Sequence, residues 1–203
     1  MISRPLKLGF LASGNGSSAE AIVDAVAGGA LAAEARLLVS NKKAAPALDW
    51  ATARGVPALA IPTINNPDAA DLALADAMTG HGVELIVLSG YLRRLGPVTL
   101  ARYAGRIVNI HPGPLPQFGG EGMYGGRVHQ AVLAAGLAES AIVIHLVDEA
   151  YDHGAELARR GVPISPGDTP RSLEDRVKAL EPAFFVETLQ RIATGELELP
   201  DAV

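Results

Sequence analysis

Cysteine is absent from this chain of 203 residues, and aromatic residues make up only 4% of it. Without cysteine there are no disulfide bonds, no thiolate metal ligands and no cysteine nucleophile. A basic excess is also missing: the formal net charge is −5, which argues against electrostatic binding of nucleic acid. No apolar run approaches the roughly 18–20 residues that a membrane-spanning helix needs. We therefore expect a cytoplasmic protein that binds neither nucleic acid nor membranes.

Aliphatic side chains dominate the composition, in which 49% of the residues are hydrophobic. The length suits one domain with a sizeable core. Short apolar runs alternate with segments of helical periodicity, and this alternation is typical of an α/β fold. The predicted strands are residues 7–12, 35–40, 56–61, 84–89, 106–111, 141–147 and 155–164. The predicted helices are residues 19–26, 45–54, 66–81, 96–103, 127–135 and 169–194.

Right-handed crossovers between successive strands require a mostly parallel sheet. We therefore predict a single-domain, Rossmann-like three-layer sandwich, with a sheet of about seven strands and helices on both faces. Such a fold gathers its functional loops at the edge where the parallel strands end.

A glycine-rich segment, Gly-Asn-Gly-Ser-Ser-Ala at residues 14–19, lies between the first predicted strand and the first predicted helix. Glycine lets the backbone approach a ligand closely, and the free N–H groups and dipole of a helix start favour a phosphate. The segment also fits the loose dinucleotide pattern G-x-G-x-x-[GA]. Residues 40–43, Ser-Asn-Lys-Lys, lack the acid that NAD needs. NADP stays open, and so does a tight turn without a ligand.

An amide and an imidazole, Asn109 and His111, stand two residues apart at the end of a predicted buried strand. Strand side chains alternate with period 2, so both should project to the same side. The imidazole can exchange a proton at neutral pH, and the amide can donate to a developing oxyanion. Because Gly-x-Ser-x-Gly is absent, direct attack by a substrate nucleophile is favoured. The alternative is a strand that simply ends in polar residues.

The polar loop at residues 148–154 follows a strand that we expect beside the Asn109 strand. A carboxylate of this loop can reach His111, raise the pKa of its imidazole and fix its tautomer. The alternatives are an acidic surface turn and a metal site at His153. No H-E-x-x-H spacing or histidine triad occurs, so we predict no metal. His81 and His129 are predicted to be solvated, and His145 to be a hydrogen-bonded core residue.

Five motifs resemble, in order and spacing, the glycinamide ribonucleotide formyltransferases among the folate-dependent formyl transferases and deformylases. The resemblance extends from about residue 7 to about residue 190. The motif Asn-x-His-Pro and the later Asp are shared by the whole family, whereas Ser-Gly-Asn-Gly-Ser is typical of the purine-pathway branch. The motifs are residues 13–17, 41–42, 88–93, 109–112 and 152–154.

The resemblance implies transfer of a formyl group from the co-substrate 10-formyltetrahydrofolate to the amine of 5′-phosphoribosylglycinamide in purine biosynthesis. It implies one formyltransferase domain over residues 1–203, in which the N-terminal half binds the nucleotide phosphate and the C-terminal half binds folate. The partners would be small-molecule substrates, and the chain a monomer or homodimer.

In the implied mechanism the amine attacks the formyl carbon, while Asn109 and His111 stabilise the oxyanion of the tetrahedral intermediate. Asp152 completes the catalytic trio, holds His111 charged and relays protons as tetrahydrofolate leaves. The implied ribonucleotide-binding residues are Gly14, Asn15, Gly16, Ser17, Ser18 and Glu181. The implied folate-binding residues are Leu92, Arg93, Arg94, Leu95, Asn109, Asp148, Glu149, Ala150, Tyr151 and Asp152.

The chain departs from the family pattern in four places. Ser18 replaces a frequent asparagine, and Ala155 replaces the usual proline. No lysine or arginine occurs from Val56 to Leu92, so the basic residue that meets the folate glutamate tail is missing. The loop at residues 117–126 is longer than usual and contains five glycines, and we predict that it is a mobile flap.

Three alternatives remain beside the transferase. A formyltetrahydrofolate deformylase would keep the trio and use water as the nucleophile. It usually carries an N-terminal regulatory domain, which we do not expect because the chain begins almost at its first strand. An NADP-dependent reductase or a non-catalytic nucleotide-binding module would explain the glycine-rich segment alone.

Overall fold

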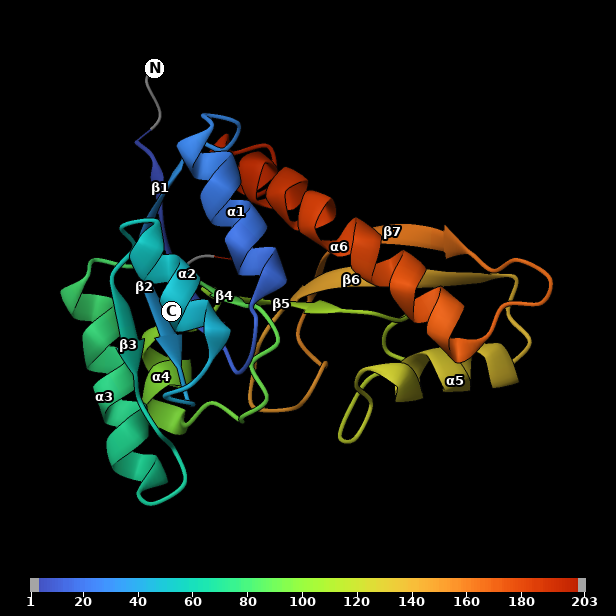
Figure 1. The fold of residues 1–203 in the computed structure, drawn as a ribbon, viewed down its shortest axis with the longest axis horizontal. Coiled ribbons are helices and arrows are strands. Elements are labelled where there is room, and N and C mark those ends of the chain that lie inside the picture. Colours follow the sequence, from blue (N-terminus) through green and yellow to red (C-terminus); the bar gives the residue numbers. More distant parts are fainter. Residues whose placement is uncertain (1–3, 201–203) are drawn as a thin grey trace.

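The structure, a computed structural model, describes residues 4–200 (Figure 1). The strands are β1 (Leu6–Ala12), β2 (Ala33–Ser40), β3 (Ala58–Ala60), β4 (Leu85–Leu88), β5 (Ile107–His111), β6 (Glu139–Leu146) and β7 (Glu156–Pro163). The helices are α1 (Ser17–Ala27), α2 (Pro46–Ala53), α3 (Pro67–Gly80), α4 (Pro97–Arg102), α5 (Gly126–Ala134) and α6 (Pro170–Ala193). No helix within residues 4–200 has the length and apolar character to cross a membrane.

One seven-stranded sheet runs through the molecule in the order β3-β2-β1-β4-β5-β6-β7. The pairs from β3 to β5 are parallel, whereas β6 is antiparallel to both β5 and β7. The predicted α/β fold with a mostly parallel sheet is confirmed. Because β1 lies between β2 and β4, the chain changes direction across the sheet at β1, and such a switch point opens a crevice at the strand ends.

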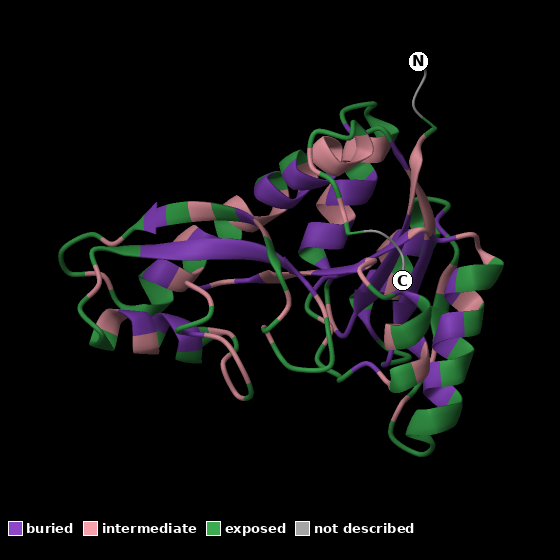
Figure 2. Cartoon of the chain, turned by 180° about the vertical axis from the view of Figure 1, so that it is seen from behind, coloured by how far each residue is buried: buried purple, intermediate pink, exposed green. Residues whose placement is uncertain are grey.

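Two hydrophobic clusters lie on opposite faces of the sheet. The larger one joins side chains of the sheet to α1, α2, α5 and α6, and the smaller one joins the other face to α3 and to residues flanking α4. Figure 2 shows the buried strands between helices whose outer surfaces are exposed. Strands covered on both faces explain the nearly continuous apolar runs in the sequence.

The predicted elements are confirmed, with shifted boundaries. β3 covers only three of the six predicted residues. Pro57 and Pro62 flank it, and proline cannot donate a hydrogen bond to a neighbouring strand. α1 begins at Ser17, two residues earlier than predicted, directly after Gly16 in a left-handed conformation.

The loops after β1 and β4 are tied together at the switch point. Ser13 donates its backbone N–H to the Gly90 carbonyl at 3.1 Å, and its hydroxyl accepts the Leu92 N–H at 2.8 Å. The same hydroxyl donates to Asn41, which follows β2, at 2.6 Å. Ser13 therefore links the loops that follow β1, β2 and β4.

The prediction that His129 is solvated is wrong. Its side chain is on α5 and the residue is only 1% exposed. The neighbouring Val128 and Val132 belong to the same hydrophobic cluster as α6, so this helix is covered where a surface helix was expected. Burial lowers the pKa of His129, which favours its neutral form.

Candidate active site

Asp152 lies in the loop between β6 and β7 and has an unusual backbone conformation. Its φ of 54° makes it the one non-glycine residue with positive φ among residues 4–200. Aspartate tolerates the left-handed region better than most side chains, but the conformation still costs free energy. Such backbone strain is concentrated at functional sites, where the surrounding structure holds it in place.

Two imidazoles flank the carboxylate of Asp152. Oδ2 is 3.4 Å from His111 Nδ1, and Oδ1 is 3.4 Å from His145 Nε2. The backbone N–H of Gly120 donates to Oδ2 at 3.0 Å. Both imidazoles are buried, and the Asp152 side chain is 11% exposed. The predicted neighbours Asp152 and His111 are therefore brought together, with a second histidine beside them.

The environment keeps Asp152 ionised. Burial by itself would raise the pKa of this carboxyl, but the hydrogen bonds from His111 and His145 outweigh it and hold the pKa well below its usual range. A carboxylate that stays charged at every physiological pH can orient an imidazole and stabilise its positive form.

Asn109 is held by the neighbouring antiparallel strand. The register of β5 and β6 places Asn109 opposite His145, and the amide Nδ2 lies 3.2 Å from His145 Nε2. His145 Nδ1 lies 2.8 Å from the Leu146 carbonyl, which can only accept, so Nδ1 carries the proton. Nε2 lies against both the Asn109 amide and the Asp152 carboxylate, and these contacts restrict the orientation of Asn109.

His145 was predicted to be a hydrogen-bonded core histidine, and it is buried and hydrogen-bonded. Its contacts with Asn109 and Asp152 also make it part of the site, which the sequence did not indicate. The available signal was its position in the strand that precedes the 148–154 loop, the strand expected to pair with β5.

His111 contacts the start of the glycine-rich loop. Its Nε2 lies 2.8 Å from the carbonyl oxygen of Phe118, which can only accept, so Nε2 donates. The other ring nitrogen, Nδ1, faces Asp152. Phe118 and Gly120 are thus fixed to two members of the predicted trio at the beginning of the 117–126 loop. Mobility of the rest of this loop stays a prediction.

A solvent-open cleft of about 500 Å³ lies beside this cluster. Of the predicted folate-binding residues, Leu92 is not part of the lining and is 66% exposed. His111 is buried and is not among the lining residues. The lining residues are Leu88, Tyr91, Arg93, Arg94, Leu95, Asn109, His145, Val147, Asp148, Glu149, Ala150, Tyr151 and Asp152.

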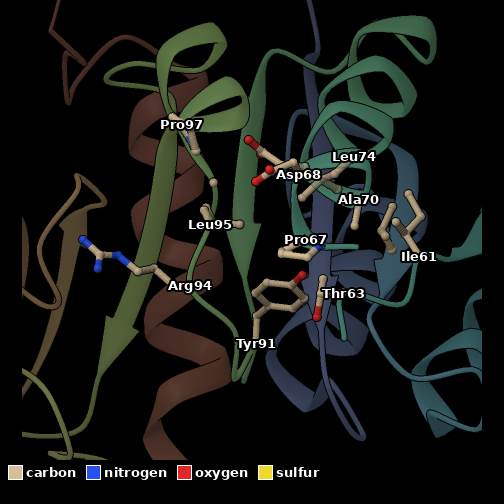
Figure 3. Close-up of a pocket in the computed structure, with 13 residues that line it drawn as sticks. Ile61, Thr63, Pro67, Asp68, Ala70, Leu74, Tyr91, Arg94, Leu95 and Pro97 are labelled. Carbon is tan, nitrogen blue, oxygen red and sulfur yellow. The ribbon is translucent and has the colours of Figure 1, made fainter. Parts of the chain in front are cut away.

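A second hollow of about 510 Å³ adjoins the cleft and shares Tyr91, Arg94 and Leu95 with it (Figure 3). Burial raises the pKa of Tyr91 to about 12, so its hydroxyl stays neutral at physiological pH. Figure 3 shows the Arg94 side chain extending away from Tyr91 and from the α3 side of the hollow. Arg94 donates to the Glu149 carbonyl and so joins the loop after β4 to the loop after β6.

The glycine-rich segment forms the start of α1. Gly16 is the N-cap residue, with φ 64° and ψ 41°, a conformation that glycine adopts without strain. The Ser89 hydroxyl accepts the Ala19 N–H at 3.1 Å. Within residues 4–200, no acceptor takes the N–H groups of Gly16, Ser17 and Ser18. These free donors at a helix N-terminus suit a phosphate group.

Glu181 lies on α6, close enough to His111 and Lys178 to interact with their charges. Burial raises the pKa of Glu181, because the charged carboxylate loses water there. His153 and Asp148 form an exposed pair at 3.0 Å. Among residues 4–200 no three His, Cys, Asp or Glu side chains are arranged to hold a metal.

Comparison with known proteins agrees with these features. The family model described as formyl transferase matches residues 6–189. A chloroplastic phosphoribosylglycinamide formyltransferase of Arabidopsis thaliana is 36% identical over 96% of this chain and 68% of its own length. The phosphoribosylglycinamide formyltransferase of Bacillus subtilis is 35% identical over 92% of this chain and 94% of its own.

A solved structure extends the likeness to three dimensions. The phosphoribosylglycinamide formyltransferase from Coxiella burnetii superposes with a TM-score of 0.87 at 34% identity, covering 98% of this chain and 92% of that one. The family model covers most of this chain, and both curated relatives exceed 30% identity. The chain therefore belongs to the formyl transferase family.

Proposed function

We propose that this chain transfers a formyl group from 10-formyltetrahydrofolate to the amine of 5′-phosphoribosylglycinamide, a step of purine biosynthesis. The observation that carries the proposal is the buried Asp152 carboxylate between two imidazoles, with the Asn109 amide beside it, at the wall of a solvent-open cleft. The named relatives, which are phosphoribosylglycinamide formyltransferases, support the choice of substrates.

The ribonucleotide binds through its phosphate at the start of α1. The free N–H groups of Gly16, Ser17 and Ser18 and the dipole of the helix attract a doubly charged group there. Gly14 and Asn15 shape the loop, and Glu181 on α6 meets the glycinamide end. A nucleophile held at both ends has lost most of its freedom before reaction, which lowers the entropic part of the barrier.

The formyl-folate binds in the cleft between the loops after β4 and β6. Arg93, Arg94 and Leu95 form one side of it, and residues 148–152 form the other. The pterin lies against backbone and apolar groups of these loops. Since no Lys or Arg occurs from Val56 to Leu92, Arg93 and Arg94 on the wall of the cleft are the cations available to the glutamate tail.

In the reaction, the neutral amine of the ribonucleotide attacks the formyl carbon, and the carbonyl π electrons move onto oxygen. Asn109 donates to this oxyanion, which forms only along the reaction path, and positive charge on His111 stabilises it. When the intermediate collapses, the bond from carbon to N10 of the folate breaks. The attacking nitrogen loses a proton, and N10 gains one.

Asp152 acts on the proton transfers, and His145 acts on the orientation of Asn109. The ionised Asp152 stabilises positive charge on His111 and can pass a proton between the amine and N10 through water. His145 contacts the Asn109 amide and so restricts its orientation. Removing either partner would leave a buried polar group unsatisfied, which is costly.

The deformylase alternative uses the same trio with water as nucleophile. It gives no role to the free N–H groups of Gly16–Ser18, because formyl-folate hydrolysis needs no phosphate site. An NADP-dependent reductase would use those groups, but it gives no role to the Asp152 cluster. Three expectations stay predictions: the location in the cytoplasm, the monomeric or homodimeric state, and the single domain over residues 1–203. The location is open because one of the relatives is a chloroplast protein.

The direct test follows folate absorbance while the chain is incubated with 10-formyltetrahydrofolate, with and without phosphoribosylglycinamide. We expect turnover only when the amine is present, because it is the nucleophile. Turnover without the amine would favour the deformylase. Absence of turnover in both mixtures would refute transferase and hydrolase alike.

Substitution of the trio tests the proposed roles. We expect His111→Ala and Asp152→Asn to lower kcat about 10²- to 10⁴-fold, the usual contribution of a positioned acid–base group. His81→Ala removes an imidazole from the end of α3 and should leave kcat unchanged. Wild-type rates in both trio variants would contradict the assignment. Thermal unfolding checks that the variants are folded, and Asp152→Asn is suited to this control because it keeps the shape of the side chain.

Glu181→Gln should change ribonucleotide binding and protein stability in opposite directions. The folded state raises the pKa of Glu181, so this carboxyl favours folding when protonated and opposes it at neutral pH, where it is ionised. We expect the amide to raise the thermal midpoint by about 2–4 °C at pH 7, with the gain disappearing as the pH falls through the carboxyl pKa. KM for the ribonucleotide should rise at the same time. A lower midpoint at pH 7 would contradict this account.

A further inference from the structure

The carbonyl groups of the glycine-rich segment are held by α2. The indole N–H of Trp50 donates to the Asn15 carbonyl at 2.7 Å, and the Ala47 N–H donates to the Gly14 carbonyl at 3.2 Å. Both acceptors lie in the loop between β1 and α1, and both donors lie on α2. Neither donor is part of the mechanism described above.

A planar trans peptide couples each carbonyl to the N–H that follows it, because the two groups point in opposite directions. With the Asn15 carbonyl fixed toward α2, the N–H of Gly16 must point away from α2. A Cβ on Gly16 would lie 3.1 Å from Ala12 on β1 and 3.4 Å from Ala47 on α2, so the loop is packed closely against both elements. The Gly16 N–H has no acceptor among residues 4–200 and is free to meet a ligand.

The indole ring is itself fixed. The guanidinium of Arg54 lies 5.6 Å from the centroid of the Trp50 ring, within the range of a cation–π contact. Arg54 also forms ion pairs with Glu20 at 2.9 Å and Asp24 at 2.7 Å, both on α1. Trp50 is thus held between α2, α1 and the loop, and its N–H direction is set before any ligand binds.

We propose that Trp50 is a positioning residue for phosphate binding: its indole N–H fixes the Asn15–Gly16 peptide so that the Gly16 N–H is aimed at the phosphate of the ribonucleotide. The identity of that ribonucleotide rests on the proposed function, whereas binding of a phosphate does not. Preorganised donors bind an anion more tightly because no free energy is spent on ordering the loop.

Trp50→Phe is the informative variant, because it keeps an aromatic ring under Arg54 and removes the N–H donor. Loss of one hydrogen bond of ordinary strength corresponds to roughly a threefold to tenfold change in affinity. We expect KM for phosphoribosylglycinamide to rise by that factor. The kcat value and KM for 10-formyltetrahydrofolate should not change, since the loop does not touch the formyl group.

Arg54→Gln is the matched control. It removes the cation over the same ring and the ion pairs to α1, but it leaves the indole N–H in place. We expect a lower thermal midpoint and a smaller rise in KM for the ribonucleotide than Trp50→Phe causes. A purely structural role of Trp50 would instead make the two variants alike, with loss of stability and parallel changes in kcat and in both KM values; that result would overturn the proposal.

Inorganic phosphate provides a readout that needs no catalysis. We expect phosphate to raise the thermal midpoint of the wild-type chain, and Trp50→Phe to need roughly threefold to tenfold more phosphate for the same shift. If this difference appears while formyl transfer is absent, the proposed function fails and the role of Trp50 stands. Equal phosphate dependence in both proteins, or none in the wild type, would overturn the role of Trp50.

Discussion

The structure of the site depends on one buried charge. Removing the Asp152 carboxylate from water is unfavourable unless the charge is paired and hydrogen-bonded. His111 on β5, His145 on β6 and the Gly120 N–H at the start of the glycine-rich loop supply those partners. Each comes from a different segment, so the carboxylate fixes the relative position of all three. The positive φ of Asp152 is maintained by the same contacts.

Sheet topology brings the second half of the site to this cluster. β1 and β4 are neighbours, and the Ser13 hydroxyl ties their loops together, while Arg94 joins the loop after β4 to the loop after β6. In Figure 1 these loops gather on one side of the sheet, below its centre in the view. The start of α1 and the end of β5 therefore lie at the same edge of the sheet, where the switch point of an open α/β sheet predicts a ligand crevice.

Much of this arrangement could be predicted from local sequence. The period of 2 placed Asn109 and His111 on one side of a strand, and alternating apolar runs predicted the fold. Long-range pairing could not be read in the same way. The contact of His145 with Asn109 depends on the register of β5 and β6, and the burial of His129 depends on how α5 packs near α6. Phe118 is hydrogen-bonded to His111, and Gly120 to Asp152. Both residues lie in a segment whose glycines predicted only mobility.

The central claim is that the two substrates meet at Asn109, and a crystal structure of the ternary complex tests it most directly. The ligands would be phosphoribosylglycinamide and a folate analogue that carries a non-transferable group in place of formyl. The account predicts the phosphate at the N–H groups of Gly16–Ser18, with the amine about 3–3.5 Å from the carbon that replaces the formyl carbon and beside Asn109 and His111. A phosphate bound elsewhere, or an amine directed away from Asn109, would contradict it.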